Sequence, residues 1–445
     1  MSGWIPYWTT DDSVATFLSN ADLFSDISPF WHSVSKDANS DSGLQISNHA
    51  LSSGTRASVL AQIKGKGALI MPSITDGTGK GTMSGVLQDT VKRTAFIEQV
   101  ADMVQSNGYD GIDLDFETFA FTDGSKSWAA TRPAWVTFVT ELAAELHTND
   151  KQLAVAVPPM YNSLQNGSSG YWVYDFAGIS PHVDKIRIMA YDYAYSSPGP
   201  IGGPLSWVEN VARFAAGVAP PGKVQLGTPT YGRDWVKSAT GVGCPSLSSN
   251  VYKSRNIATS ISGLAESSWK RDPASLERFV NYKLTYNGGK CVVRRAAWMS
   301  DSTTVIARAQ IADKYGLSGQ ALWMVGTEQP NLWAPLRNIA LGQPVDTVNI
   351  TSQAIAVKAS RKRVRRGGTV KIKGRVSPAR PRVKVNLQRR SGSKWVTITS
   401  MRTNAGGGYS ITARPGVRRA KYRILVRRTS GYSRALSGTV VIRTF

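Results

Sequence analysis

The stretch Asn107-Gly-Tyr-Asp110-Gly-Ile-Asp113-Leu-Asp115-Phe-Glu117 places four carboxylates within eight residues. Apolar residues alternate with the last three acids, which predicts a strand with one apolar face. Because residues i, i+2 and i+4 of a strand project from the same side, Asp113, Asp115 and Glu117 share a face. Three carboxylates on one face repel one another unless they share protons, so the pattern favours an active site. The spacing alone also allows an acidic strand edge covered by solvent.

Apolar runs and amphipathic segments alternate on both sides of this stretch, over residues 3–345. Eight runs read as strands: 3–7, 27–32, 68–74, 111–116, 153–157, 185–190, 224–228 and 319–324. Apolar residues at helical spacing lie between them, at 90–106, 135–147 and 305–315. Strands that alternate with helices over this length predict an α/β fold, a (β/α)8 TIM barrel. Glu117 directly follows the fourth strand, at the face where such barrels carry their active sites.

Residues 232–300 separate the seventh and eighth strands and are too long for one βα unit. This length predicts an inserted subdomain that forms one wall of a cleft. Cys244 and Cys291, the only cysteines of the chain, both lie inside it. A pair confined to one segment favours a disulfide and an exported protein. Two buried free thiols are the alternative.

Net charge divides the chain into two parts. Residues 346–445 hold 25 of the 53 Lys and Arg residues but only one of the 30 acidic residues, so the basic character belongs to an appended module. Period-2 runs at 370–376, 383–389, 395–398, 422–427 and 439–443 predict an all-β sandwich that resembles bacterial immunoglobulin-like modules. We therefore expect a barrel over residues 1–340, a linker at 341–348 and a basic β-sandwich over residues 349–445.

Several segments of the predicted barrel resemble one enzyme family. Asp110-x-x-Asp113-x-Asp115-x-Glu117 is similar to the D-x-x-D-x-D-x-E signature of the family 18 glycoside hydrolases, the chitinase-like enzymes. Met189-Ala-Tyr191-Asp192 and the segment Leu226-Gly-Thr-Pro-Thr-Tyr231-Gly-Arg233-Asp-Trp235 resemble the family's sixth and seventh strands, and Trp323 stands where the family has a tryptophan on its eighth strand. The resemblance covers residues 3–335. Residues 313–333 look most like the bacterial branch of spore-cortex and cell-wall N-acetylglucosaminidases.

The resemblance implies a glycosidase that cleaves β-linked N-acetylglucosamine-containing glycans, of peptidoglycan or chitin type, by retaining, substrate-assisted catalysis. Glu117 would protonate the glycosidic oxygen, and Asp115 would orient the substrate's acetamido group. Asp113 would share a proton with Asp115, and Tyr191 would donate its hydroxyl to the acetamido oxygen. The implied substrate-binding residues are Trp323, Asp192, Tyr231, Tyr7, Met189 and Asp110.

Some of these residues also fit simpler roles. Asp110 precedes a glycine and is typical of a turn cap. Trp323 and Met189 are also typical of an ordinary core. The alternative function is a non-catalytic, lectin-like glycan-binding protein of the cell wall on the same barrel. The presence of Glu117 together with Asp115 favours an enzyme.

Other classes of function receive little support. The four histidines are dispersed without ligand spacing and no nucleotide-binding fingerprint occurs, so we expect neither a metal nor a cofactor. No run of about 18 apolar residues occurs, so we expect no membrane span. Beside a glycosidase, the basic module favours an anionic cell-wall polymer as its partner and makes nucleic acid unlikely, although a basic surface without a partner is also possible.

The N-terminal residues bear on localisation. Residues 1–10 have neither the basic nor the apolar region of a signal peptide. The chain is then either intracellular or a mature form from which a signal peptide is absent. We expect the second, a secreted or cell-wall-associated protein.

Overall fold

The structure is a computed structural model that describes residues 1–49, 51–256, 261, 268–343, 354–377, 379, 382–392, 394–427 and 435–445. The chain divides into two compact units, Met1–Val345 and Asp346–Phe445. The first unit holds a barrel and an inserted sheet, and the described elements of the second are all β-strands.

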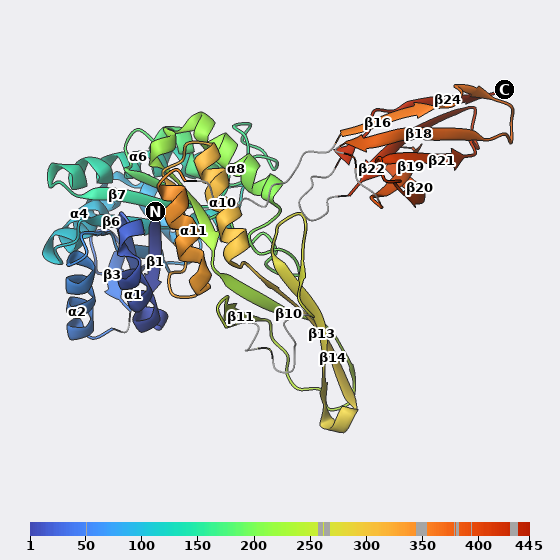
Figure 1. Cartoon of the computed structure of the whole chain (residues 1–445). Coiled ribbons are helices and arrows are strands. Elements are labelled where there is room, and N and C mark those ends of the chain that lie inside the picture. Colours follow the sequence, from blue (N-terminus) through green and yellow to red (C-terminus); the bar gives the residue numbers. More distant parts are fainter. Residues whose placement is uncertain are drawn as a thin grey trace. The chain divides into compact units, whose positions relative to one another are not determined.

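Eight parallel strands form a closed barrel in the first unit (Figure 1). β1 pairs with both β2 and β15, and this double pairing closes the ring. In chain order the strands are β1 (Ser2–Pro6), β2 (Asp26–Lys36), β5 (Ser73–Asp76), β6 (Gly111–Asp115), β7 (Gln152–Val157), β8 (Lys185–Ile188), β9 (Val224–Pro229) and β15 (Gly319–Trp323). Their apolar residues are buried, as in parallel sheets covered by helices. The predicted (β/α)8 barrel is confirmed.

Helices follow the barrel strands along the chain and cover the outside of the ring. Side-chain caps define where several of them begin: Asp89 accepts hydrogen bonds from two backbone N–H groups of α4, and Asp301 accepts one from Thr304 in α10. The α-helices are α1 (Thr10–Ser19), α2 (Ser53–Lys64), α3 (Thr82–Gln88), α4 (Thr90–Ser106), α5 (Thr118–Phe121), α6 (Trp128–Thr148), α7 (Phe176–Ile179), α8 (Leu205–Val218), α10 (Ser302–Lys314) and α11 (Trp333–Ala340). The helix predicted at 90–106 is confirmed, and those predicted at 135–147 and 305–315 correspond to α6 and α10.

The third predicted strand, 68–74, is wrong as one continuous element. The structure splits it into β4 (Leu69–Ile70) and β5, with Met71 and Pro72 between them. Proline has no backbone N–H to donate to the ladder, which accounts for the break. The carbonyl of Pro72 still accepts a hydrogen bond from the backbone N–H of Asp113, so β6 keeps its register beside the break. A short antiparallel strand, β3 (Leu44–Asn48), extends β2 on the outside.

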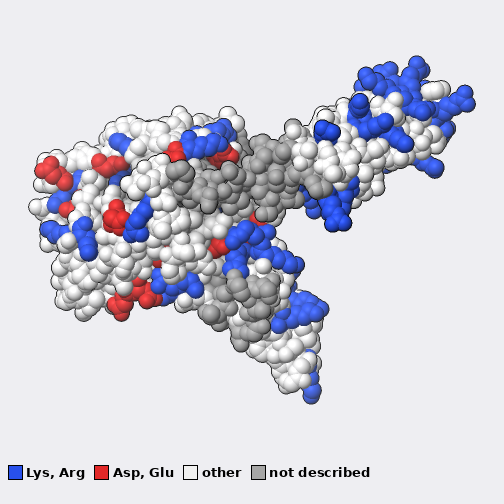
Figure 2. All heavy atoms as spheres, viewed as in Figure 1, with Lys and Arg blue, Asp and Glu red and all other residues white. Residues whose placement is uncertain are grey.

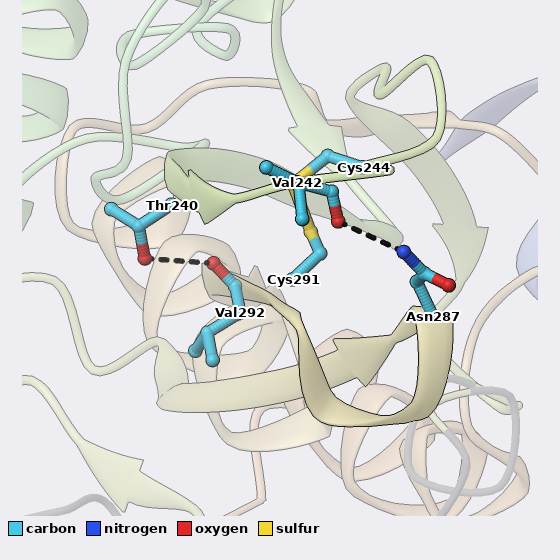
Figure 3. Close-up of a disulfide and its surroundings, with 6 residues drawn as sticks. All are labelled: Thr240, Val242, Cys244, Asn287, Cys291 and Val292. Atoms are coloured by element: carbon cyan, nitrogen blue, oxygen red, sulfur yellow. Dashed lines mark hydrogen bonds between the residues drawn. A yellow bond between two sulfur atoms is a disulfide. The ribbon is translucent and has the colours of Figure 1, made fainter.

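The insertion between β9 and β15 forms a five-stranded antiparallel sheet, which we call the hairpin sheet. Its order is β11 (Asn250–Lys253), β10 (Tyr231–Gly241), β14 (Cys291–Met299), β13 (Arg278–Tyr286) and β12 (Lys270–Arg271). β13 and β14 make the long hairpin that projects from the barrel in Figure 1. Cys244 and Cys291 are joined by a disulfide near the far end of this hairpin (Figure 3), with their Cα atoms 5.3 Å apart. The predicted bridge is confirmed, and free thiols are excluded for this pair.

The second unit is a β-sandwich around its own apolar core. One sheet has the order β16 (Ala354–Ala359), β18 (Val370–Ser377), β21 (Gly408–Ala413). The other has the order β17 (Arg363–Val364), β24 (Val440–Thr444), β22 (Arg419–Val426), β19 (Lys384–Ser391), β20 (Lys394–Arg402), with β23 (Ala435–Leu436) on β22. The predicted all-β sandwich is confirmed, although β16, β17, β21 and β23 were not predicted. Most of the predicted linker, residues 344–348, lies outside the described residues.

Candidate active site

A cavity of about 840 Å³ opens at the carboxyl ends of the barrel strands. Its polar floor contains the carboxyl groups of Asp115, Glu117 and Asp192, and most of its walls are aromatic. The other lining residues are Trp4, Trp8, Phe30, Phe121, Ala156, Pro158, Pro159, Tyr161, Tyr171, Met189, Tyr191, Tyr193, Tyr195, Trp207 and Trp323. Its volume is that of a small-molecule or oligosaccharide pocket rather than a packing defect.

Glu117 and Asp115 form a coupled pair at the end of β6. A side-chain hydrogen bond joins the two carboxyl groups, and such a bond requires one proton between them. Burial raises the pKa of Glu117 to about 7, and the charge of Asp192 acts in the same direction. Burial also raises the pKa of Asp115, with further contributions from Glu117 and Asp113. Near neutral pH the pair therefore holds a proton that two exposed carboxylates would release.

Asp115 combines a buried carboxylate oxygen with a place in the cavity wall. Its Oδ1 atom is buried and has no hydrogen-bond partner within the part of the chain that the structure describes. A buried carboxylate oxygen without a donor disfavours the ionised form, in line with the raised pKa of this group. The residue also lines the cavity, so its carboxyl group borders the space open to a bound molecule.

Asp113 is bound differently from the sequence-based expectation. Its Oδ1 atom lies 3.0 Å from Nη1 of Arg187, and its Oδ2 atom accepts hydrogen bonds from Trp4 (2.8 Å) and Ser73 (2.6 Å). No side-chain hydrogen bond between described residues joins it to Asp115, whose proton-sharing partner is Glu117. The predicted Asp113–Asp115 proton-sharing pair is therefore replaced by an ion pair of Asp113 with Arg187. Asp113 is fully buried and does not line the cavity.

Tyr191 lies between the strand ends and lines the cavity. Burial and the nearby Asp115 carboxyl raise the pKa of its hydroxyl well above the usual range, so the group stays protonated and can donate. Gly227 on β9 leaves room for this ring, because a Cβ atom there would lie 3.0 Å from Cε1 of Tyr191 and 2.4 Å from the carbonyl oxygen of Ile188. The hydroxyl is thus placed by close packing.

Asp192 is held by two residues of β10. Tyr231 donates its hydroxyl to Oδ1 of Asp192, and Nη2 of Arg233 lies 3.2 Å from the same oxygen. Asp192 has a φ of 51°, in the left-handed region that aspartate tolerates better than most residues. Tyr231 itself does not line the cavity, so it acts on the site through Asp192.

Trp323 and Met189 both line the cavity. The indole of Trp323 is packed edge-on by Trp4, Phe30 and Trp8, with ring centroids 5.8, 5.1 and 6.4 Å away. These contacts fix the orientation of its face. The edges of the Trp323 indole are packed as in an ordinary core. An ordinary core role does not explain why the residue also lines the cavity.

Tyr7 and Asp110 are not brought to the cavity. The ring of Tyr7 stacks on His49 with centroids 4.6 Å apart, and its neighbour Trp8 lines the cavity instead. Asp110 precedes β6 at the opposite end from Glu117, where its Oδ2 accepts a hydrogen bond from the backbone N–H of Ile70 at 2.8 Å. The structural role considered for Asp110 fits this position, and the substrate-binding role does not.

The predicted cleft wall from residues 232–300 also needs correction. Every described residue that lines the cavity comes from positions 4–207 or is Trp323. The hairpin sheet contacts the cavity residues from behind through Asp192, which Tyr231 and Arg233 hold, and at the rim, where Arg233 lies over the ring of Tyr195, 4.6 Å from its centroid. Trp235 donates its indole N–H to the carbonyl of the same tyrosine.

Several residues of the site were missed in the sequence. Arg187 had a visible signal, because a cation inside the otherwise apolar run 185–190 must find a buried partner. Trp4 and Ser73 gave no signal, since neither residue type nor spacing shows that they donate to Asp113. Aromatic residues of the connections between barrel strands, among them Trp8, Tyr195 and Trp207, also line the cavity. They are far apart in the sequence, which hides their proximity in space.

Two absences concern the described residues only. Within them, His, Cys, Asp and Glu side chains form no group of three that could hold a metal ion. No described helix has the length and apolar character needed to cross a membrane.

Comparison with known proteins assigns the barrel unit to a family. The family model "Glycosyl hydrolases family 18" matches residues 7–328. An uncharacterized glycosylase, YvbX, of Bacillus subtilis (strain 168) is 23% identical over 57% of this chain and 68% of its own length. A cortical fragment-lytic enzyme of the same organism is 24% identical over 55% of this chain and 53% of its own. A sporulation-specific glycosylase is matched over 34% of its own length. The chain therefore spans between about a third and two thirds of the length of these three relatives.

Solved structures share the fold of the barrel unit. A chitinase from Chromobacterium violaceum ATCC 12472 has a TM-score of 0.61 and 20% identity, and the match covers 77% of this chain and 99% of that one. The spore cortex-lytic enzyme SleL of Bacillus cereus has a TM-score of 0.58 and 19% identity, over 76% of this chain and 73% of the other.

Proposed function

Because the chain belongs to glycosyl hydrolase family 18, we propose that it cleaves glycans at β-linked N-acetylglucosamine, with retention of configuration and with Glu117 as the proton donor. One observation carries this proposal. The carboxyl of Glu117 lines the cavity, and its pKa is raised to about 7, so near neutral pH the hydrogen-bonded pair of Glu117 and Asp115 retains a proton that Glu117 can donate. A general acid is most effective when its pKa lies near the working pH.

The first step breaks the bond between the anomeric carbon and the leaving oxygen. Glu117 transfers its proton to that oxygen while the acetamido carbonyl oxygen of the same sugar attacks the anomeric carbon and forms an oxazolinium ion. Asp115, whose carboxyl group lines the cavity, accepts the acetamido N–H and balances the positive charge. Tyr191 donates its hydroxyl to the acetamido oxygen and keeps it in attack geometry.

The second step returns the site to its starting state. Glu117, now a carboxylate, takes a proton from water as the water attacks the anomeric carbon from the face that the leaving group vacated. The oxazolinium opens and the product keeps the β configuration. Trp323, braced by Trp4 and Phe30, supports the apolar face of the sugar during both steps.

The substrate is a peptidoglycan-type or chitin-type glycan. Relatives of this chain are named cortical fragment-lytic enzyme and probable chitinase, and both names imply polymers that contain N-acetylglucosamine. The long aromatic lining of the cavity suits successive sugar rings, which stack on aromatic faces.

The second unit is proposed to hold the enzyme on an anionic cell-wall polymer. Residues 347–445 contain 25 Lys and Arg residues and no acid. A surface hollow of about 770 Å³ on β18 and its neighbours is lined by Lys358, Lys373, Arg375 and Arg402. This hollow offers several cations to one polyanionic chain. We place the protein outside the cell or at its wall, where the Cys244–Cys291 disulfide persists.

Substitution of Glu117 by Gln tests the mechanism, because glutamine keeps the size of the side chain but cannot donate the proton as an acid. Hydrolysis of N-acetyl-chitooligosaccharides and of soluble peptidoglycan strands should fall by about 10²–10⁴-fold while binding persists. Glu145→Gln, at an exposed position of α6, is the matched control and should keep full activity. Undiminished hydrolysis by Glu117→Gln would exclude this mechanism. Binding without turnover by the wild-type chain would favour the lectin-like alternative.

A further inference from the structure

The hairpin sheet differs in charge from the barrel that carries it. Residues 232–300 contain 11 Lys and Arg but four Asp and Glu, whereas the remainder of residues 1–345 contains 17 basic and 25 acidic residues. In the view of Figure 2, blue Lys and Arg side chains lie along the projecting hairpin, while red Asp and Glu side chains gather on the barrel. An excess of cations on one element of an acidic unit points to an anionic partner for that element.

Several cations of residues 232–300 are already paired. Arg295 binds Asp234, Arg255 binds Glu328, and Arg271 binds Asp301. These pairs fix the sheet to itself and to the barrel, so they are not free to bind a ligand. The face of the hairpin opposite to Arg295 is different.

Lys283 and Arg294 stand directly opposite each other on β13 and β14, so their side chains share one face of the sheet. Both side chains are exposed, and neither has an ion-pair partner among the described residues. Lys237 reaches the same face, because its Nζ donates to Oδ1 of Asn281, two residues before Lys283. Like charges in register destabilise a sheet unless an opposite charge lies on them. This face therefore lacks a counter-charge.

The same face continues into the cavity rim. Trp298 on β14 lies four residues after Arg294, closer to the barrel by about 13 Å along the strand. It stacks on Phe279 with ring centroids 4.8 Å apart, and it is opposite Arg233 on β10. Arg233 in turn lies over Tyr195, a cavity residue that is 63% exposed. A continuous surface thus runs from the cavity through Tyr195 to the three cations.

We propose that Lys237, Lys283 and Arg294 bind the carboxylates of an acidic glycan whose scissile bond lies at Glu117. This inference rests on the proposed function and specifies its substrate: a glycan strand with regularly spaced carboxylate substituents, rather than neutral chitin. The aromatic cavity accepts the sugar rings, and the cations select for the charged strand beyond the rim. Because the cations lie beyond the cavity, only a strand that extends well past the scissile bond reaches them.

The test is the double variant Lys283→Glu/Arg294→Glu in the full chain. Its substrates are soluble strands of alternating N-acetylglucosamine and N-acetylmuramic acid, which carry lactyl carboxylates, and the neutral N-acetylglucosamine hexamer. We expect kcat/KM on the long acidic strands to fall by about tenfold or more, and the loss to shrink at high salt. The value for the neutral hexamer and for a short acidic tetrasaccharide should stay within about twofold of wild type.

The double variant Lys64→Glu/Lys66→Glu at the end of α2 changes the net charge equally at two exposed sites away from the sheet, and it should leave all three substrates unaffected. An equal loss on acidic and neutral substrates, no loss on the acidic strands, or an equal loss in this control would overturn the inference. Binding of the long acidic strand to Glu117→Gln, with and without the hairpin substitutions, separates the two proposals. This binding measurement gives the contribution of the hairpin cations to affinity even if the chain hydrolyses nothing.

Discussion

Two layers of buried carboxyl groups lie along the barrel axis, and they differ in whether a cation is paired with them. In the inner layer, Asp26 is paired with Lys185 and Arg187, and Asp113 is paired with Arg187 as well. In the outer layer, Asp115 and Glu117 form no ion pair with any Lys or Arg that the structure describes, and they share a hydrogen-bonded proton. Only two positions along β6 separate Asp113 from Asp115.

The difference shows how one strand can carry both a fixed charge and a mobile proton. A cation beside a carboxylate stabilises the ionised form, whereas burial without a cation stabilises the protonated form. The guanidinium of Arg187 pairs with the inner carboxylates, those of Asp26 and Asp113. Among the described residues, no Lys or Arg compensates the charge of the outer layer in the same way. The pKa of Glu117 is therefore raised because Arg187 pairs with the inner layer and not with the outer one.

The largest effect is expected from removal of the cation. Arg187→Met leaves Asp113 buried without its cation, which should lower the free energy of unfolding of the barrel unit by about 3–5 kcal/mol, as measured by urea denaturation. Adding Asp113→Asn should recover part of this loss, because the uncompensated charge is then gone. Equal stability of Arg187→Met and wild type would mean that the inner layer does not depend on its cation.

The outer layer should respond in activity rather than in stability. Asp115→Asn removes the acceptor of the acetamido group and should lower kcat about 10²–10³-fold. The unfolding free energy at pH 8 should stay equal or rise, since the lost carboxylate has no ion-pair partner. A loss of stability similar to that of Arg187→Met would erase the distinction between the layers.

A substitution at Trp4 tests the contribution of an uncharged hydrogen-bond donor to the inner layer. Its indole N–H donates to Oδ2 of Asp113, so Trp4→Phe removes one hydrogen bond to a buried carboxylate. We expect a loss of about 1.5–3 kcal/mol in the free energy of unfolding. The same substitution at Trp128, whose indole donates to the backbone carbonyl of Ala120, is a matched control and should cost about 0.5–1.5 kcal/mol.

The smallest effect concerns pH. Glu117 donates its proton only below its pKa, so kcat/KM should decline as pH rises through about 7. The charge of Asp192 contributes to this raised pKa, so Asp192→Asn should move the decline to lower pH. A pH–rate profile measures both. A decline that stays in place, or moves to higher pH, would remove Asp192 from the causes.

Stability should follow pH for the same reason. The folded-state pKa of Glu117 lies above its ordinary value, so its contribution to stability is fully present below the ordinary pKa and is lost as pH rises through about 7. In Glu117→Gln the contribution of this carboxyl group disappears, whereas burial still raises the pKa of Asp115. The difference between the two unfolding curves should therefore grow from pH 5 to pH 8, by about 1–3 kcal/mol.

Much of the fold could be predicted because strand and helix patterns are local. The run 111–116 and the helix 90–106 carry their own periodicity, and Glu117 follows from its place after a strand. Pro72 broke a strand for a local reason that the prediction overlooked. The strand β21 went unpredicted because its alternation is short and lies between turns.

The contacts within the site depend on distance in space, which the sequence does not record. Nothing near Asp113 in the chain indicates that Arg187, 74 positions later, supplies its cation. For the same reason Tyr7 was predicted in the cavity although Trp8 occupies it, since a one-residue difference after β1 decides which ring turns inward. The rim contact of Arg233 with Tyr195 likewise joins two loops that the sequence separates.

Closure of the barrel has a consequence for the order of folding. Ser2 of β1 pairs with Ala321 of β15, so the ring remains open until nearly the whole barrel unit has been synthesised. Until then β1 has only β2 as a neighbour, and the growing sheet keeps an unpaired edge that invites association with other chains. The buried Asp26 must likewise wait for Arg187, more than 150 residues later, before its charge is compensated. The sheet is therefore completed late and slowly, because the closed ring that carries the proton donor at its mouth requires pairing between strands far apart in the sequence.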